Sequence, residues 1–196
     1  MSNRTQALPE LTGVQRVVRE LRYHESSRQL IGIALIALLS WLGHPTTLSF
    51  WIGMPLVVLG TAVRMWAAGV IFKNQVLATT GPYAFVRHPL YVGNILVLAG
   101  FGVASALWWA PPLLLAFLIF YYPTAIEYED RKLHRIFGEQ WSDWSVEVRA
   151  LLPRRRPFQS GQRVQWSFSQ SLRRNGEPII MLYLIGCAVW LHMKLS

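Results

Sequence analysis

A short segment between two apolar stretches carries the residues whose chemistry stands out most. It reads TGPYAFVRHPLYVG over residues 80–93 and places an arginine, a histidine and two tyrosines at the start of an apolar run. Pro89 suits the first turn of a helix, where its missing N–H costs nothing. His88 and Tyr91 are three residues apart and would then share a helix face. These are more polar groups than a helix cap with interfacial anchoring residues needs, so we interpret the segment as a candidate binding site.

A second polar group reads EYEDRKLHRIFG over residues 127–138 and directly follows another apolar stretch. Glu127 and Arg131 are four residues apart, so a local ion pair on a solvated helix accounts for them. That explanation accounts less well for Glu129 if its side chain turns back toward the other helices. The sequence leaves that direction open.

Arg64 is the third candidate, eight residues before Phe72 at the end of an apolar stretch. An arginine inside a membrane segment is costly and marks a functional site by default. The alternative is that its long side chain reaches the interface from about two turns inside. Both interpretations stay open at this point.

The elements that must position these groups are predicted to be membrane helices. The chain of 196 residues is 53% hydrophobic and 15% charged, against about 25% charged in soluble domains. Its long apolar stretches are residues 30–43, 48–72, 90–110, 113–126 and 179–193. A bilayer core needs about 20 apolar residues per helix, which the second and third stretches provide. We expect an all-α, polytopic bundle of about five transmembrane helices, with three spans plus interfacial helices as the alternative.

The basic residues predict the orientation of this bundle. Five arginines precede the first stretch, and ten lysines and arginines lie between the fourth and fifth, whereas the alternate loops carry none. The positive-inside rule then places the N-terminus and both polar segments in the cytoplasm, with the C-terminus on the opposite side. Residues 13–28 repeat apolar residues at helical spacing among arginines, which is typical of an interfacial helix. The first residues lack the apolar core of a cleavable signal peptide, so we expect insertion through later helices.

Several classes of function fit poorly. The net charge is +9, but the basic residues lie in blocks beside apolar stretches, as they do in the cytoplasmic flanks of membrane helices. No nucleic-acid partner is therefore expected. The five histidines are scattered and Cys187 is the only cysteine, so no metal site is predicted. Gly100-Phe101-Gly102 follows no predicted strand, which favours close helix packing over dinucleotide binding.

Together these segments resemble the membrane methyltransferases of the isoprenylcysteine carboxyl methyltransferase and phospholipid methyltransferase group. The similar motifs are Gly-Pro-Tyr and Arg-His-Pro-x-Tyr-x-Gly within residues 81–93, an acidic pair at 129–130, Phe-Gly at 137–138, and GTAVRMWAAGV around Arg64. The resemblance covers about residues 60–153. It departs from the family pattern where Asp130 replaces a glutamate and where Trp141 and Trp144 replace tyrosines.

The resemblance implies that S-adenosylmethionine binds on the cytoplasmic side, between the two polar segments. A carboxylate such as Glu129 suits the sulfonium and ammonium of this cofactor, and Arg87 or His88 suits its carboxylate. Its adenine would stack on an aromatic ring. The expected cofactor-binding residues are Tyr83, Arg87, His88, Tyr91, Gly93, Glu129, Asp130 and Trp144. The expected catalytic residues are Arg64, His88 and Glu129.

The expected acceptor is a lipophilic molecule or lipidated substrate whose tail enters sideways from the membrane lipids. An isoprenylcysteine-type carboxylate is favoured and a phospholipid amine comes next. The alternatives are a membrane reductase that resembles sterol reductases and uses NADPH, and a membrane scaffold without enzymatic activity. We expect a single membrane domain with a cytoplasmic or interfacial segment at 1–28, the motif region at 60–153, and a basic linker with the last helix at 154–196. The oligomeric state and the role of the linker stay open.

Overall fold

The computed structural model describes residues 12–71, 75–159, 166–171 and 177–195. Within these residues the chain is helical and contains no strand. The helices are α1 Gly13–Tyr23, α2 Glu25–Leu42, α3 Thr47–Ala68, the 3₁₀ helix η1 Gly81–Ala84, α4 Pro89–Ala104, α5 Ala110–Phe137, α6 Glu139–Glu147 and α7 Glu177–His192. The first residues of the predicted N-terminal segment, the predicted helix end at Phe72 and parts of the basic linker lie outside the described residues.

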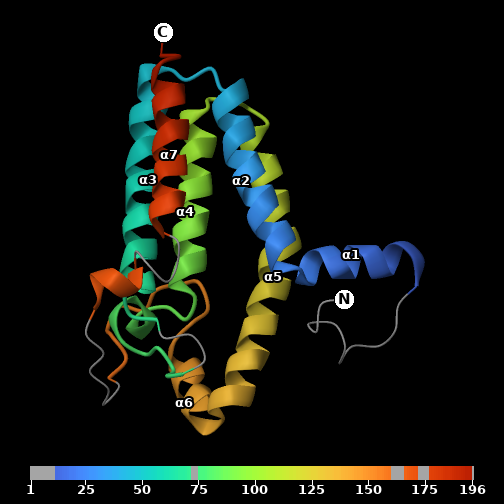
Figure 1. Cartoon of the computed structure of the whole chain (residues 1–196), viewed down its shortest axis with the longest axis vertical. Coiled ribbons are helices and arrows are strands. Elements are labelled where there is room, and N and C mark those ends of the chain that lie inside the picture. The colour runs from blue at the N-terminus through green and yellow to red at the C-terminus, as the bar shows by residue number, and fades with distance from the viewer. Residues whose placement is uncertain (1–11, 72–74, 160–165, 172–176, 196) are drawn as a thin grey trace.

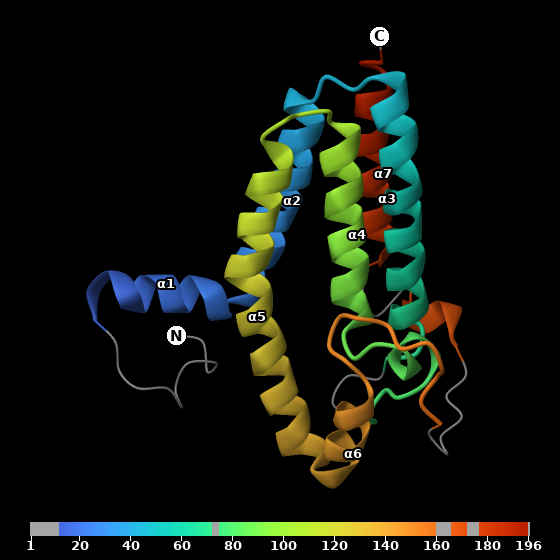
Figure 2. The same ribbon diagram turned by 180° about the vertical axis from the view of Figure 1, so that it is seen from behind.

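Five of the helices form a bundle, and α1 projects from its side (Figure 1, Figure 2). Figure 1 shows α3, α4 and α7 side by side, with α2 and α5 next to them and α1 projecting to the side. Seen from behind, α5 continues beyond the end of α4 and curves back beneath it to meet α6 (Figure 2). The motif loops gather at this same end. The predicted all-α membrane helical bundle is therefore confirmed.

Two of these helices are long and apolar enough to cross a membrane by themselves. They are α3, with 22 residues, and α5, with 28 residues. At 1.5 Å per residue, α5 extends over about 42 Å and reaches beyond a hydrocarbon core of about 30 Å. Its last turns carry the acidic segment 127–138. The helices α2, α4 and α7 are shorter apolar helices beside them, so the predicted number of spans and their orientation stay predictions.

The helix formed by the third apolar stretch is shorter than the stretch itself. The sequence predicts a helix over residues 90–110, whereas α4 ends at Ala104. Ala106 has a φ of 53°, in the left-handed region, and turns the chain back. A new helix then starts at Ala110 with prolines in its first turn, where they are well tolerated.

The backbones of α3 and α4 touch through pairs of glycines. A Cβ atom on Gly53 would lie 2.4 Å from the carbonyl oxygen of Gly100, and one on Gly60 would lie 2.6 Å from that of Gly93. Glycine allows this close approach, which replaces the missing hydrophobic drive between helices in lipid. The expectation that Gly100 serves helix packing is confirmed. Gly93, expected in the cofactor site, faces α3 instead.

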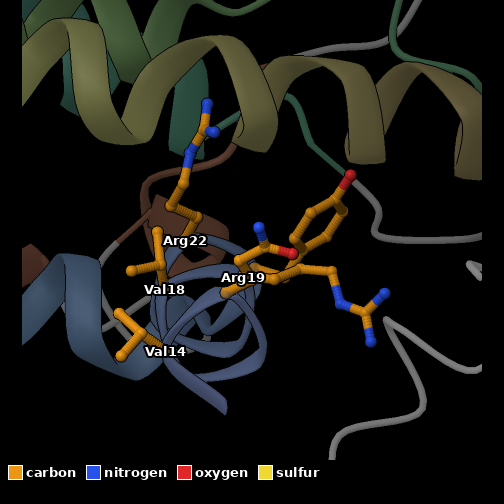
Figure 3. A pocket seen from close by; sticks show the side chains of 6 residues that line it. Val14, Val18, Arg19 and Arg22 are labelled. Atoms are coloured by element: carbon orange, nitrogen blue, oxygen red, sulfur yellow. The ribbon is translucent and has the colours of Figure 1, made fainter. Parts of the chain in front are cut away.

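The helix α1 is amphipathic and attached to α5. Its valines Val14 and Val17 are exposed, and Arg22 Nε donates a hydrogen bond of 3.0 Å to the backbone oxygen of Phe120. Figure 3 shows Arg22 extending from α1 toward α5, with Val14 and Val18 in the shallow groove beside it. This arrangement fits the interfacial helix predicted from the sequence.

Candidate active site

The helix-start motif folds locally as its glycines and prolines predict. Gly81 has a φ of 58° and begins η1. The helix α4 begins at Pro89, with His88 as its N-cap residue. The rings of His88 and Tyr91 stack with 5.3 Å between their centroids, which confirms that they share a face. The predicted turn and helix start are therefore both present.

The chain that follows α6 returns along this motif and fixes its backbone. The amides of Arg87 and His88 donate to the carbonyls of residues 149 and 150, at 2.9 and 3.1 Å. In return, the amides of residues 154 and 158 donate to Phe85 and Ala84, at 2.9 and 2.8 Å. These four long-range bonds hold the site together from two distant parts of the sequence.

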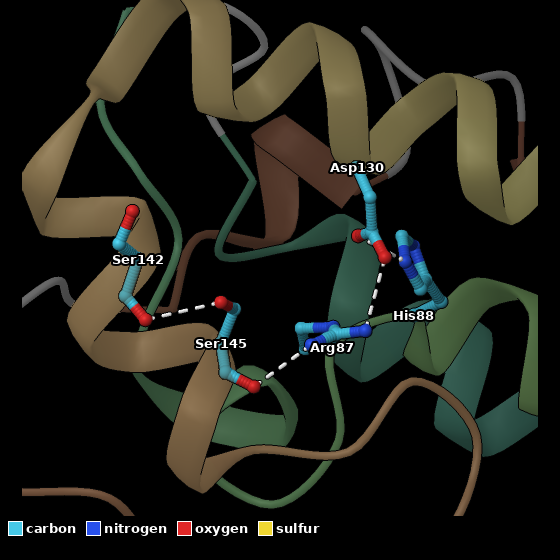
Figure 4. A network of polar contacts seen from close by, with 5 residues as sticks. All are labelled: Arg87, His88, Asp130, Ser142 and Ser145. Carbon is cyan, nitrogen blue, oxygen red and sulfur yellow. Dashed lines mark hydrogen bonds and ion pairs between the residues drawn. The ribbon is translucent and has the colours of Figure 1, made fainter.

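The side chains of Arg87 and His88 both bind Asp130 (Figure 4). Arg87 Nη2 lies 2.9 Å from Asp130 Oδ2, and His88 Nε2 lies 3.0 Å from Asp130 Oδ1. Arg87 Nη1 also donates to the backbone oxygen of Ser145 at 2.8 Å. One carboxylate on α5 thus orients an arginine and a histidine at the start of α4, and the arginine also reaches α6.

The sequence favoured Glu129 as the acid of the site, and the structure places Asp130 against Arg87 and His88. Neighbouring residues of a helix point about 100° apart, so Glu129 faces a different direction. Its carboxylate acts electrostatically on the phenol of Tyr83. Within the described part of the chain, no hydrogen bond or ion pair to Glu129 is formed. Glu129 therefore remains available to a ligand.

Several buried polar atoms near Tyr83 have no partner. Among the described residues, the Oγ1 atoms of Thr79 and Thr80, the Tyr83 hydroxyl, Arg87 Nε and Trp141 Nε1 are buried without a hydrogen bond. Buried polar groups are normally satisfied, so unsatisfied ones gathered in one place indicate a ligand or water. Burial raises the pKa of the Tyr83 phenol, which keeps it protonated and able to donate a hydrogen bond.

The two tryptophans of the motif region have different surroundings. Trp144 is 1% exposed and donates from Nε1 to the backbone oxygen of Tyr83 at 3.2 Å. With its ring enclosed in this way, Trp144 supports the motif and offers no face to an adenine, contrary to the expectation. Trp141 is partly buried, and the Arg87 guanidinium lies 5.8 Å from its ring centroid. Of the two tryptophan rings, Trp141 is therefore the one that a ligand can reach.

Arg64 is held inside the bundle by residues that the sequence did not single out. Its Nη2 and Nε lie 2.8 and 3.2 Å from the two carboxylate oxygens of Glu177, at the start of α7. Its Nη1 binds the side-chain oxygen of Asn94 on α4. Glu177 is 2% exposed, so Arg64 forms a buried ion pair and does not extend to the interface. The signal for Glu177 was an acid directly before a proline at the start of an apolar stretch.

The fold and the polar residues define a helical membrane protein with a cluster of polar side chains at one end of its bundle. The phospholipid methyltransferase family model matches residues 27–140, more than half of the chain. The chain therefore belongs to this family, and the resemblance seen in its motifs is confirmed.

Three known proteins are similar to parts of the chain. The nickel-cobalt-cadmium resistance protein NccN of Alcaligenes xylosoxydans xylosoxydans is 36% identical over 143 residues, which are 68% of this chain and 65% of that protein. The cobalt-zinc-cadmium resistance protein CzcN of Cupriavidus metallidurans is 41% identical over 106 residues, 53% of this chain and 48% of that protein. The methanethiol S-methyltransferase of Crocosphaera subtropica is 35% identical over 77 residues, 36% of this chain and 27% of that protein.

The matched region spans less than two thirds of the length of each of these relatives. No solved structure matches the chain.

Proposed function

We propose that the protein is a membrane methyltransferase that uses S-adenosylmethionine and acts on a lipophilic acceptor. The observation that carries the proposal is the set of buried, unpartnered hydroxyls at Thr79, Thr80 and Tyr83 beside the Arg87–His88 pair bound to Asp130. Family membership and a relative whose name describes a methyltransferase support the same conclusion.

The residues present fit the chemical groups of this cofactor. Its ammonium and sulfonium need an acceptor of negative charge, and Glu129 offers a carboxylate to which no described residue is bonded. Its carboxylate and ribose hydroxyls need donors and acceptors, which Thr79, Thr80 and Tyr83 offer. Trp141 offers the ring for the adenine. When bound, the cofactor supplies an electrophilic methyl group on a positively charged sulfur.

The protein contributes to methyl transfer by aligning the acceptor with the methyl group and by excluding water from the site. An in-line displacement gains most from holding the nucleophile and the methyl carbon at short distance with water excluded. The backbone bonds between the motif and residues 149–158 make this end of the site rigid. Asp130 fixes the ring of His88, which can then accept a proton from an acceptor that has one to lose. Arg64 takes a positioning role, because Glu177 and Asn94 already bind its guanidinium.

A groove along α5 offers a path for an apolar acceptor tail. It has a volume of about 740 Å³ and is lined by Pro123 and Ile126 and, farther along, by Glu127, Asp130, Arg131, His134, Arg135 and Trp141. The apolar part is short, so the end of a tail would lie against Pro123 and Ile126 while the reactive group reaches the polar residues. Candidate acceptors are an isoprenylcysteine-type carboxylate, a phospholipid amine and a thiol.

Calorimetric titration of the detergent-purified protein with S-adenosylmethionine, and separately with NADPH, tests the proposal. We expect S-adenosylmethionine alone to bind, and Glu129→Ala to weaken its binding about tenfold or more, as expected for a lost hydrogen bond to a charged group. Glu139→Ala is the matched control, because Glu139 is exposed at the start of α6 and does not line the groove along α5. Its affinity should equal that of the wild type.

Two outcomes would overturn the proposal. Binding of NADPH alone would favour a reductase. Binding of neither ligand by a protein that unfolds cooperatively would favour a scaffold without enzymatic activity.

A further inference from the structure

Arg28 points to the kind of acceptor. This residue lies in the first part of α2 and is one of the five arginines before the first apolar stretch, for which the sequence suggested only a role in orienting the protein. Its guanidinium carbon lies 4.9 Å from the ring centroid of Tyr91. Tyr91 in turn stacks on His88, which binds Asp130. Arg28 is thus joined to the candidate active site through two rings.

The Arg28 guanidinium has no acidic partner and no hydrogen-bond acceptor among the described residues. The contact with Tyr91 uses its positive charge, and within the described residues none of its N–H groups donates a hydrogen bond and no acid pairs with it. The side chain is only partly exposed, so water satisfies it incompletely. A cation in the first turns of a helix is also disfavoured by the helix dipole. The fold therefore keeps an arginine here without a local partner.

The surroundings of Arg28 favour an anion as its ligand. Tyr91 and Tyr122 are its neighbours, with ring centroids 5.4 Å apart, and Arg28 acts electrostatically on Tyr122. Neither ring is an acceptor strong enough to replace a carboxylate. Arg64 and Arg87, the other two arginines assigned to this region of the bundle, already have carboxylate partners. Of these three arginines, Arg28 is the one without a carboxylate partner among the described residues.

The charge balance of the proposed complex supports the same conclusion. The charged residues placed at or next to the site are Arg28, Arg64 and Arg87 against Glu129, Asp130 and Glu177, so their charges balance. Glu127 and Arg131 beside them form a further balanced pair. Bound S-adenosylmethionine carries a sulfonium, an ammonium and a carboxylate, and so adds one net positive charge. An anionic acceptor restores neutrality in a site of low dielectric constant, where an unbalanced charge is costly.

We propose that Arg28 binds the anionic group of the acceptor and so selects a carboxylate or a thiolate over an amine. This inference rests on the proposed methyltransferase function. The acceptor oxygen or sulfur uses a lone pair to bond the methyl carbon while the bond from that carbon to the sulfonium sulfur breaks and leaves its electron pair on the sulfur. A carboxylate reacts as it is, and a thiol first loses its proton to His88 or to solvent. The product is neutral, so Arg28 holds it less tightly and release is favoured.

The experiment compares three probes of equal chain length, which are hexanoate, hexanethiol and hexylamine. Their binding to the detergent-purified protein is measured by calorimetry at pH 8 with sinefungin present, because this analogue carries a protonated amine in place of the sulfonium and has no methyl group to transfer. Methyl transfer from labelled S-adenosylmethionine is followed in parallel. We expect one or both of the anion-forming probes to bind and to be methylated, with hexylamine weaker. The two anion-forming probes separate a carboxylate from a thiol acceptor.

The variants assign this preference to Arg28. Arg28→Gln should weaken binding of the preferred anion and raise its KM about tenfold or more, because a charge-assisted hydrogen bond is lost. The affinity for S-adenosylmethionine should stay within about twofold of the wild type, which also shows that the variant is folded. Arg28→Lys should restore part of the binding. Arg16→Gln is the matched control, because Arg16 is exposed on α1 and does not line the groove assigned to the acceptor.

The outcomes separate this inference from the proposed function. If the wild type binds no S-adenosylmethionine, the proposed function fails and the inference fails with it. If the wild type binds the cofactor but prefers hexylamine, or if Arg28→Gln leaves anion binding unchanged, the inference alone is overturned. Equal loss of cofactor and anion binding in Arg28→Gln would assign Arg28 to the cofactor and would also overturn it.

Discussion

Two arginines in this bundle each bind a carboxylate from a distant helix, and the rest of their surroundings differ. Arg64 lies within α3 and meets Glu177 with two bonds, while Asn94 takes a further N–H. Arg87 lies in the loop before α4 and meets Asp130 with one nitrogen. Around Arg64 the described partners close the network, whereas around Arg87 a buried Nε is left without one.

This difference shows that an arginine–carboxylate pair can serve two purposes in one bundle. A fully satisfied buried pair specifies how helices assemble, and breaking it leaves an uncompensated charge. A pair with donors left over, next to unpartnered hydroxyls, is prepared for a ligand. The Arg64 network therefore holds α7 against α3 and α4, and the Arg87 network is the one that we assign to binding.

The largest effect is expected from Glu177→Ala. This change leaves the Arg64 guanidinium buried with Asn94 alone, and breaking a buried pair in this way costs about 3–5 kcal/mol of unfolding free energy. The measurement is denaturant unfolding in detergent. Replacing both partners, as Arg64→Met with Glu177→Leu, should recover most of the loss. If Glu177→Ala left stability unchanged and abolished cofactor binding, the Arg64 network would serve binding instead of helix assembly, and our assignment would be wrong.

A smaller effect on stability and a larger one on binding are expected from Asp130→Asn. The amide keeps the shape but loses the charge that orients Arg87 and His88, so cofactor binding should weaken by about 1.5–3 kcal/mol, the range for hydrogen bonds to charged groups. Calorimetry with S-adenosylmethionine measures this. Glu139→Gln, at an exposed position at the start of α6, should leave both stability and cofactor binding unchanged. Loss of stability as large as in Glu177→Ala would remove the contrast between the two networks.

The smallest effect is expected from Tyr83→Phe. Its hydroxyl has no partner in the described part of the chain, so its removal should leave the unfolding free energy at pH 7 within about 0.5 kcal/mol or raise it slightly. Cofactor affinity should fall several-fold if the hydroxyl contacts the ligand.

The pH dependence of the same variant provides a second measurement. Burial raises the pKa of the Tyr83 phenol, so the unfolded chain loses this proton first as the pH rises past the ordinary value of about 10. The Tyr83 contribution to stability is therefore complete below pH 10 and is lost above it. The wild type should lose stability more steeply than Tyr83→Phe between pH 10 and 11. Equal slopes would show that Tyr83 is accessible to water.

Local sequence decided the features that depend on neighbours within one turn. Pro89 starts α4, His88 and Tyr91 stack at a spacing of three, and Glu127 pairs with Arg131 at a spacing of four. The apolar stretches likewise determine a helical bundle, because in lipid each backbone group must be satisfied within its own helix. The prediction of one helix over residues 90–110 was wrong, because the chain turns at Ala106. An alanine gives no sequence signal for a left-handed backbone conformation.

Tertiary structure alone decided which charges meet. Glu129 and Asp130 are adjacent, and only the rotation of α5 against α4 turns Asp130 toward Arg87 and His88. Glu177 reaches Arg64 across 113 residues of sequence, and Arg28 reaches Tyr91 from another helix. Trp144 became a buried support because the chain after α6 folds back onto the motif. Such contacts depend on how whole helices pack, and the free energy of that packing is spread over many residues far apart in the sequence.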